Sequence, residues 1–223
     1  VCSSDLVMKV ETAITRLKNI LPIKDRLDDM NVDSATIYLA VVNSFFEKGR
    51  AARLSELESI HSDAREIVAD LGKQDMLTLD DTGEVKGCYP FTMEKRVHRI
   101  QLNGFEVHAM CAMDALAPGS MFECSSVISS ECEVTAKPIR IELNNQTIEN
   151  IEDVAEVHFG MNWMAASSCC SCADSLCTEM LFLKDKETAM AWLNADAENR
   201  EIFTLPDAVK FATGFFKPMM QQG

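Results

Sequence analysis

The spacing of the apolar residues changes partway along the chain, and this change constrains the fold more than any other feature. Up to about residue 72, apolar residues recur every three or four positions, as on one face of an amphipathic helix. From about residue 97 they alternate with polar residues, as in half-buried strands. Helices followed by strands predict an α+β protein with a largely antiparallel sheet.

The first part of the chain, residues 1–87, is predicted to be a helical, winged-helix-like domain. Pro22 ends the first helical pattern, Gly49 suits a C-terminal cap, and Asp63 with Glu66 suits a capping box. A hairpin turning at residues 81–83 would form the wing. The helices are expected over residues 5–21, from Asp33 or Ser34 to Gly49, over 54–61 and over 64–72.

Winged helices often bind DNA, but charge argues against that function here. The candidate recognition helix carries two basic residues, Arg65 and Lys73, in a stretch that also contains four acidic ones. The whole chain has a formal net charge of −14. Nucleic-acid binding needs a basic face that replaces counterions, so we favour a packing or lid role for this helix and expect no nucleic-acid partner.

The second part, residues 88–223, is predicted to be the α+β domain with the largely antiparallel sheet. Asn103-Gly104 between two alternating runs is a strong type I′ hairpin signal. A short helix should follow at once and end at Pro118-Gly119. Further strands are expected over 125–131, 137–145, 155–163 and 200–205, and helices over 186–196 and 206–216.

Nothing in the sequence points to a membrane or to secretion. The apolar runs are far shorter than the roughly 18 residues of a membrane span, and the first residues show no secretory signal. Nine cysteines without such a signal favour thiol chemistry or metal binding over a disulfide framework. We therefore expect a cytoplasmic protein without a membrane partner.

Cys111 and Asp114 form the first candidate site. Residues three apart on a helix share a face, and the positive end of a helix lowers the pKa of a thiol. A neighbouring carboxylate raises that pKa instead, so the pair suits a proton-handling couple or a cation site. The alternative is a buried cysteine with a solvent-facing aspartate.

The second candidate site is the segment Cys169–Cys177, which reads CCSCADSLC. Three uses are open to its thiols, Cys169, Cys170, Cys172 and Cys177: a zinc site, a redox dithiol, or a site that captures a soft metal ion. Capture of a soft metal ion is the most specific of the three. An apolar strand, expected to begin near Cys177, would place that thiol in the core.

Taken together, these segments resemble the alkylmercury lyase (MerB) family. The resemblance begins in GCYPFTMEKRVHRIQLNGFEVHAMCAMDALAPGSMF, residues 87–122, and continues in SSECEVTAKPI, residues 129–139. It resumes in LCTEMLFLKDKETAMAWL, residues 176–193. The order and spacing of the motifs make the match specific, and it implies a MerB/NosL-like α+β fold.

The resemblance implies a chemistry and roles for three residues. Cys111 and Cys177 would be the thiolate ligands of mercury and Asp114 the proton shuttle in protonolysis of a carbon–mercury bond. The substrate would be an organomercurial or another organometal, and the product Hg(II) would pass to a low-molecular-weight thiol or to mercuric reductase. No cofactor is expected, and a homodimer is left open.

The chain also departs from the family pattern. Leu181 stands where the family has a histidine, and Cys169, Cys170 and Cys172 are extra thiols. They could relay metal, bind a different soft element, or include the true second thiol in place of Cys177. Three functions stay open at this point: the lyase, a soft-metal binding or trafficking protein on the same fold, and a metal-responsive regulator.

Overall fold

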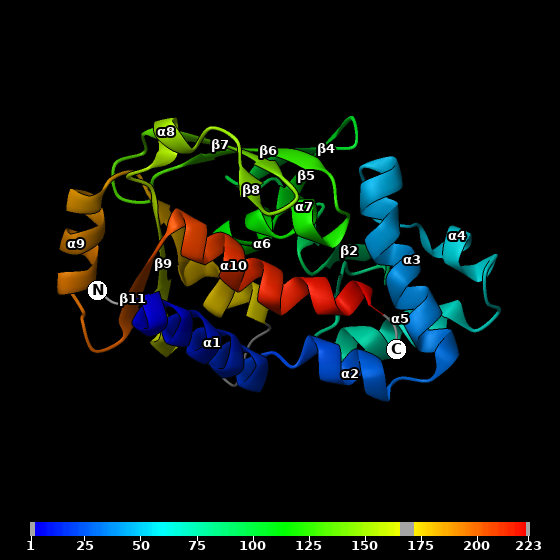
Figure 1. Ribbon diagram of the computed structural model, residues 1–223. Coiled ribbons are helices and arrows are strands. Elements are labelled where there is room, and N and C mark those ends of the chain that lie inside the picture. Colours follow the sequence, from blue (N-terminus) through cyan, green and yellow to red (C-terminus); the bar gives the residue numbers. More distant parts are fainter. Residues whose placement is uncertain (1–2, 166–171, 222–223) are drawn as a thin grey trace.

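A computed structural model describes residues 3–165 and 172–221 (Figure 1). Two sheets form its β-structure, and every strand pair that the structure describes is antiparallel. The larger sheet has the strand order β1-β2-β3-β5-β4-β6-β7-β8, and the smaller has the order β10-β9-β11. The predicted α+β class with a largely antiparallel sheet is confirmed.

The strands of the larger sheet are β1 (Leu77–Leu79), β2 (Val85–Cys88), β3 (Phe91–Thr92), β4 (Arg99–Leu102), β5 (Phe105–Ala109), β6 (Ser125–Glu131), β7 (Pro138–Asn144) and β8 (Thr147–Ile148). Those of the smaller sheet are β9 (His158–Asn162), β10 (Met180–Leu183) and β11 (Arg200–Thr204). The α-helices are α1 (Ser3–Ile20), α2 (Ile23–Asp29), α3 (Val32–Lys48), α4 (Leu54–Glu58), α5 (Ala64–Lys73), α6 (Ala112–Leu116), α7 (Pro118–Met121), α8 (Ile151–Val154), α9 (Lys186–Asn194) and α10 (Leu205–Phe216). The 3₁₀ turns are η1 (Trp163–Ala165), η2 (Cys172–Asp174), η3 (Leu176–Glu179) and η4 (Lys217–Met220).

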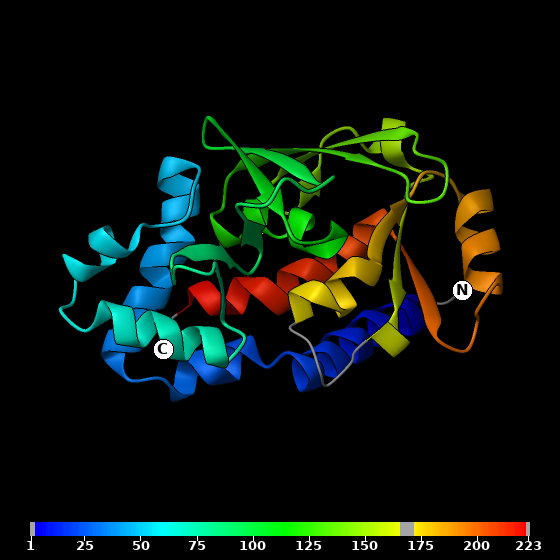
Figure 2. The same cartoon turned by 180° about the vertical axis from the view of Figure 1, so that it is seen from behind.

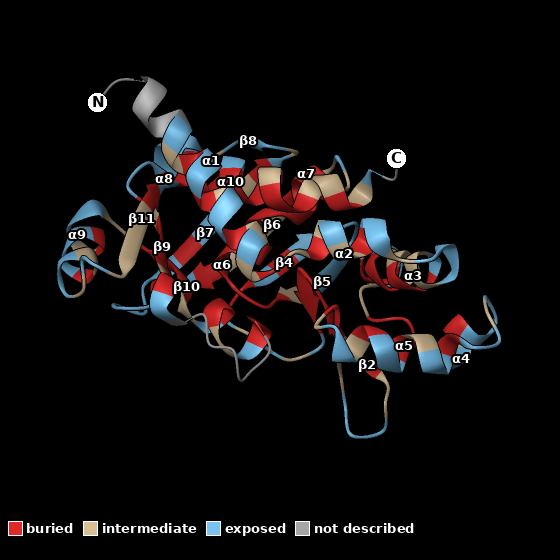
Figure 3. Ribbon diagram, turned by 90° about the horizontal axis from the view of Figure 1, so that it is seen from below, coloured by how far each residue is buried: buried red, intermediate tan, exposed pale blue. Residues whose placement is uncertain are grey.

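Helix α10 runs through the middle of the molecule. It packs against α1 on one side and against α6 on the other (Figure 1). Phe211 and Phe216 of α10 are completely buried, and Pro206 lies in its first turn, as the sequence predicted. Figure 3 shows α6 among buried residues, whereas the outer faces of α1 and α2 carry exposed ones. The core therefore forms around α6 and α10, from both parts of the chain.

Local turn chemistry explains the two hairpins. Asn103 and Gly104 both have positive φ, 49° and 83°, as a type I′ turn requires, and they join β4 to β5. Gly83, with φ 84°, lies in the turn between β1 and β2. Both hairpins were predicted, but β1–β2 is the edge of the larger sheet rather than a free wing. The predicted boundary between residues 87 and 88 falls inside β2, so the division into two domains stays a prediction.

Several predicted helix ends need correction. Asn31 caps α3, because its side chain accepts from the Ser34 N–H at 2.8 Å; the cap is therefore neither Asp33 nor Ser34. Gly49 ends α3 in the left-handed conformation, as predicted. Helix α2 begins directly after Pro22 and was not predicted, since a proline that ends one helix can also open the next.

The predicted capping box at Asp63 and Glu66 is wrong, because the Asp63 side chain makes no capping hydrogen bond and α5 continues through Gly72 to Lys73. The short helix after the hairpin, α6, ends at Leu116, just before the predicted stop at Pro118-Gly119. Pro118 itself begins the next helix, α7.

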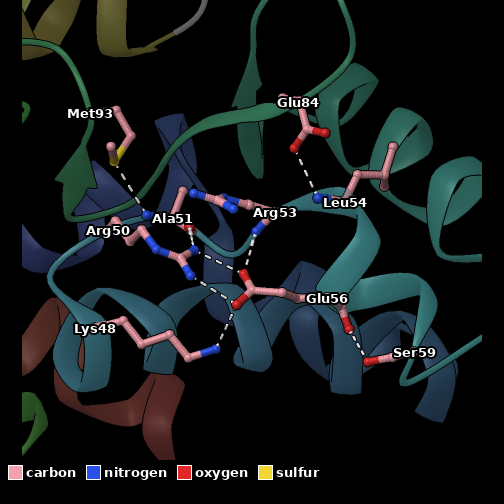
Figure 4. A network of polar contacts seen from close by, with 9 residues as sticks. All are labelled: Lys48, Arg50, Ala51, Arg53, Leu54, Glu56, Ser59, Glu84 and Met93. Atoms are coloured by element: carbon pink, nitrogen blue, oxygen red, sulfur yellow. Dashed lines mark hydrogen bonds and ion pairs between the residues drawn. The ribbon is translucent and has the colours of Figure 1, made fainter.

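The Glu56 side chain links the end of α3 and the loop that follows it to the start of α4 (Figure 4). Its carboxylate accepts from both guanidinium NH groups of Arg50 at 2.8 Å and from Lys48 Nζ at 3.0 Å. It also accepts from the backbone N–H of Arg53 at 2.8 Å. Glu84, beside the β1–β2 turn, accepts from the Leu54 N–H at 2.8 Å, so the helical segment is tied to the hairpin.

Candidate functional site

Cys111 lies where strand β5 gives way to helix α6. It is the N-cap of α6, with extended backbone (φ −149°, ψ 179°), and its sulfur accepts from the Asp114 N–H at 3.4 Å. The cysteine thus takes the place that serine or threonine commonly fills at a helix start. Asp114 is the third residue of the helix, so the Cys-x-x-Asp spacing joins a cap to the first turn. The prediction that both residues lie within one helix is therefore wrong for Cys111.

Cys177 lies close to Cys111 in space although it is 66 residues later in the sequence. It lies in η3, three residues before β10, whereas the sequence suggested that the strand itself began near it. Strand β10 pairs with β9 and contacts α6, which brings η3 to Cys111. The sulfur of Cys111 also lies 3.5 Å from the Met180 sulfur.

The structure brings together the three predicted residues. One ligand atom of each of Cys111, Asp114 and Cys177 lies within 4.8 Å of the others, and all three side chains are buried. We call these three residues the Cys–Asp–Cys cluster. Two sulfurs and a carboxylate at this separation can surround a soft metal ion, with the carboxylate left to handle a proton.

Burial sets the protonation of the cluster. It raises the pKa of Asp114 to about 7, and Asp114 Oδ2 has no hydrogen-bond partner among the described residues. Burial likewise raises the pKa of Cys111 to about 12. The pKa of Cys177 is raised by its hydrogen bond with Cys111, by that with Cys172 and by burial, in this order. Both thiols therefore hold their protons at neutral pH.

This electrostatic result corrects one expectation. At the helix start the thiol pKa was expected to fall, and beside Asp114 it was expected to rise. In the structure desolvation is the largest cause of the raised Cys111 pKa, and the Asp114 charge acts in the same direction. A soft metal ion that enters the cluster would displace thiol protons, and Asp114 is the neighbouring group able to take one up.

Of the extra thiols, only Cys172 falls in the described part of the chain. Its sulfur lies 3.9 Å from the Cys177 sulfur, and it is buried. Cys169 and Cys170 lie outside the described residues. Cys177, rather than Cys172, belongs to the Cys–Asp–Cys cluster, which supports the register that aligned Cys177 with the second family cysteine.

Sequence reasoning missed the residues that hold this segment. Tyr89 Oη donates to Asp75 Oδ1 at 3.2 Å and accepts from the Ala173 N–H at 2.9 Å. Asp75 Oδ2 accepts from the Cys172 N–H at 3.0 Å. Nothing in the sequence around Asp75 or Tyr89 indicates this link.

A cavity of about 240 Å³ lies next to the cluster. Met110 and Ala173, the chain neighbours of Cys111 and Cys172, contribute to its wall, but none of the three cluster residues lines it. Lys86, Glu94 and Arg96 form ion pairs on another part of the wall. The cavity wall thus includes the chain neighbours of two of the thiols, while the three cluster residues stay outside it.

The remaining predicted features have structural roles. Trp163 is buried, donates to Glu201 Oε2 at 2.9 Å and lies under the Arg16 guanidinium. Trp192 lies beneath Arg200, and His108 Nδ1 is 2.8 Å from the Arg96 carbonyl oxygen. Cys132 is buried, and Cys124 is half-buried.

Comparison with known proteins places this geometry in context. The sequence model of a family described as MerB, alkylmercury lyase, matches residues 91–217. An alkylmercury lyase of Staphylococcus epidermidis is 23% identical over 182 residues, which are 73% of this chain and 82% of that protein. An alkylmercury lyase of Bacillus cereus is 26% identical over 116 residues, which are 52% of this chain and 51% of that protein.

The fold has a counterpart among solved structures. The crystal structure of the mercury-bound form of MerB2 superposes with a TM-score of 0.73 at 19% identity. The superposition covers 91% of this chain and 98% of that one. At this identity the likeness concerns the fold, including the helical N-terminal part that precedes the matched residues 91–217.

Proposed function

The chain belongs to the alkylmercury lyase family, and we propose that it cleaves carbon–mercury bonds by protonolysis, with Cys111, Cys177 and Asp114 as the reacting groups. The observation that carries these roles is the Cys–Asp–Cys cluster, whose ligand atoms lie within 4.8 Å of one another in a buried place. The substrate is an organomercurial, and the products are a hydrocarbon and Hg(II).

The first step exchanges one thiolate for another. The Cys111 sulfur bonds to the mercury of an organomercury–thiol complex, and the carrier thiolate leaves with the Cys111 proton. The Cys177 sulfur then bonds to the same mercury, and its proton passes to the Asp114 carboxylate. Because burial raises the pKa of Asp114 to about 7, this carboxylate holds a proton far more readily than an exposed aspartate does.

The second step breaks the carbon–mercury bond. Asp114 donates its proton to the metal-bound carbon, the electron pair of the carbon–mercury bond becomes the new carbon–hydrogen bond, and the hydrocarbon leaves. Mercury stays bonded to two thiolates, and Asp114 is again a carboxylate. Burial of the three residues favours this transfer, because it limits the access of solvent that would compete for the proton.

The buried aspartate favours a lyase over a protein that only binds or carries soft metal. Capture of Hg(II) needs thiolates but no proton donor. A buried carboxyl with an unpartnered oxygen destabilises the fold. A role in proton delivery would explain why the protein has such a group. Regulation through DNA has less support, because both basic residues of α5 are paired, Arg65 with Glu58 and Lys73 with Asp70.

We further propose that the protein acts in the cytoplasm and passes Hg(II) to a low-molecular-weight thiol or to mercuric reductase. No helix in the described ranges is long and apolar enough to cross a membrane. The homodimer stays a prediction, which sedimentation would measure.

Headspace gas chromatography tests the proposed function. Purified protein is mixed with methylmercury or phenylmercury and excess small thiol, and methane or benzene is followed over many turnovers. Cys111→Ser should abolish hydrocarbon release, whereas Cys124→Ser, which changes a half-buried thiol outside the cluster, should retain it. Tight mercury binding by the wild type without hydrocarbon would contradict a lyase and favour capture.

A further inference from the structure

A third buried sulfur lies beside the Cys–Asp–Cys cluster. Cys111 and Cys177 share the cluster, and the Cys172 sulfur lies 3.9 Å from that of Cys177. Their exposed fractions are 1% for Cys111, 4% for Cys177 and 7% for Cys172. All three residues are buried, and Cys172 has the largest exposed fraction of the three.

Hydrogen bonds fix the backbone that carries Cys172. Its N–H donates to Asp75, and the N–H of Ala173 donates to Tyr89, which itself donates to Asp75. The Cys172 carbonyl accepts from the Ser175 N–H at 3.3 Å, which closes the turn toward Cys177. Seen from behind (Figure 2), η2 and η3 lie in front of α10. Three backbone hydrogen bonds thus set the position of this thiol beside Cys177.

We propose that Cys172 is a third sulfur ligand for Hg(II), which binds the ion after the carbon–mercury bond has broken and draws it toward the exposed side of the site. This inference deepens the proposed function, because it takes the Hg(II) product of that reaction as its ligand. Asp75 and Tyr89 are positioning residues that act through the backbone of residues 172 and 173.

The exchange is balanced in atoms and electrons. The Cys172 sulfur donates an electron pair to mercury that is already bonded to Cys111 and Cys177, and the Cys172 thiol proton leaves to solvent on the exposed side. The ion is then bonded to three thiolates and carries one negative charge more than before. An incoming small thiolate replaces these ligands one at a time, and each released cysteine takes up a proton. Soft metal ions favour such thiolate exchange.

Mercury X-ray absorption tests the proposal directly. Reduced protein is loaded with one equivalent of inorganic Hg(II), and the number of sulfur neighbours is measured. We expect three neighbours in the wild type and two in Cys172→Ser, a change of one atom that should leave the fold intact. The matched control Cys124→Ser should keep three. Two neighbours in the wild type, or three in Cys172→Ser, would overturn the proposal.

Release of the ion supplies a second readout. When Hg(II)-loaded protein is mixed with excess small thiol, mercury should leave Cys172→Ser about tenfold more slowly than the wild type, equivalent to about 1.4 kcal/mol in the barrier. Equal release rates would contradict a role in exit. Both measurements start from inorganic Hg(II), so they are independent of bond cleavage. If the protein makes no hydrocarbon but its mercury has three sulfur neighbours, the proposed lyase activity is refuted while the role of Cys172 as third ligand stands.

Discussion

Replacing Asp114 with asparagine should stabilise the protein at alkaline pH while removing its activity. Burial raises the pKa of Asp114 from the ordinary 3.8 to about 7 in the folded state. The unfolded chain therefore loses this proton near pH 4, and the folded protein loses it near pH 7. Between these values unfolding releases a proton, so the free energy of unfolding falls as pH rises.

The size of the effect follows from the same two values. A rise in pKa from 3.8 to about 7 corresponds to about 4 kcal/mol, which is the stability that Asp114 itself costs the protein as pH rises from about 4 to about 7. Asparagine has nearly the same shape and does not ionise. Its buried amide costs roughly 1–3 kcal/mol. Asp114→Asn should thus be less stable than the wild type near pH 4 and more stable by roughly 1–3 kcal/mol at pH 8.

Urea unfolding of both proteins from pH 4 to pH 8 measures this difference. For a chain of this length, each kcal/mol corresponds to roughly 2–4 °C in Tm, so thermal scans can check the result. Asp70→Asn is the matched control, since the Asp70 side chain is 64% exposed on α5 and should show no such crossing. A stability difference between Asp114→Asn and the wild type that does not change with pH would refute the reasoning.

The same variant should lose turnover by roughly 10²–10⁴-fold, the usual contribution of a positioned acid or base. It should still bind Hg(II), because both thiols remain. A variant that turned over at the wild-type rate would remove Asp114 from the chemistry.

Three further predictions concern stability. Glu56→Gln should lower the free energy of unfolding at neutral pH; its hydrogen bonds with Arg50 lower the Glu56 pKa, so urea titrations should show the difference fading as pH falls below about 4.5. Gly87→Ala should cost roughly 1–3 kcal/mol in thermal unfolding, because its new Cβ would lie 2.9 Å from the Phe91 carbonyl oxygen, and an unchanged Tm would refute this. Burial lowers the pKa of His98 to about 4, so the unfolded chain takes up this proton near pH 6.5 and the folded protein only near pH 4. The His98 contribution to stability should therefore fall by about 3 kcal/mol on acidification from pH 6.5 to pH 4, measured as the change in the stability difference between the wild type and His98→Gln. A difference between these two proteins that stays constant over this range would be contrary evidence.

Features set by a few neighbouring residues could be predicted from the sequence. The turn at Asn103-Gly104 needs two residues that tolerate positive φ, and the left-handed cap at Gly49 needs one. Alternation predicted strand β6 with the bounds Ser125–Glu131 that the structure shows. The pairing of Cys111 and Asp114 followed from their spacing, although the cap geometry did not.

Features set by contacts between distant residues could not be predicted in this way. Asp75 and Tyr89 meet Cys172 and Ala173 across nearly a hundred positions, and no local pattern marks them. The pKa of Cys111 depends on burial by the whole fold, which outweighs the helix start that the sequence reveals. Cys177 was matched to its role through the family resemblance, because a cysteine-rich segment alone leaves several candidates.

The most direct test of the central claim is a single turnover followed by native mass spectrometry. Excess protein is mixed with phenylmercury without added thiol, and the mass of the complex and the benzene released are measured together. The wild type should release one benzene per mercury and retain Hg(II) alone. Asp114→Asn should retain intact phenylmercury on its cysteines. Benzene released from Asp114→Asn at the wild-type rate, or phenylmercury left uncleaved on the wild type, would contradict proton delivery by the Cys–Asp–Cys cluster.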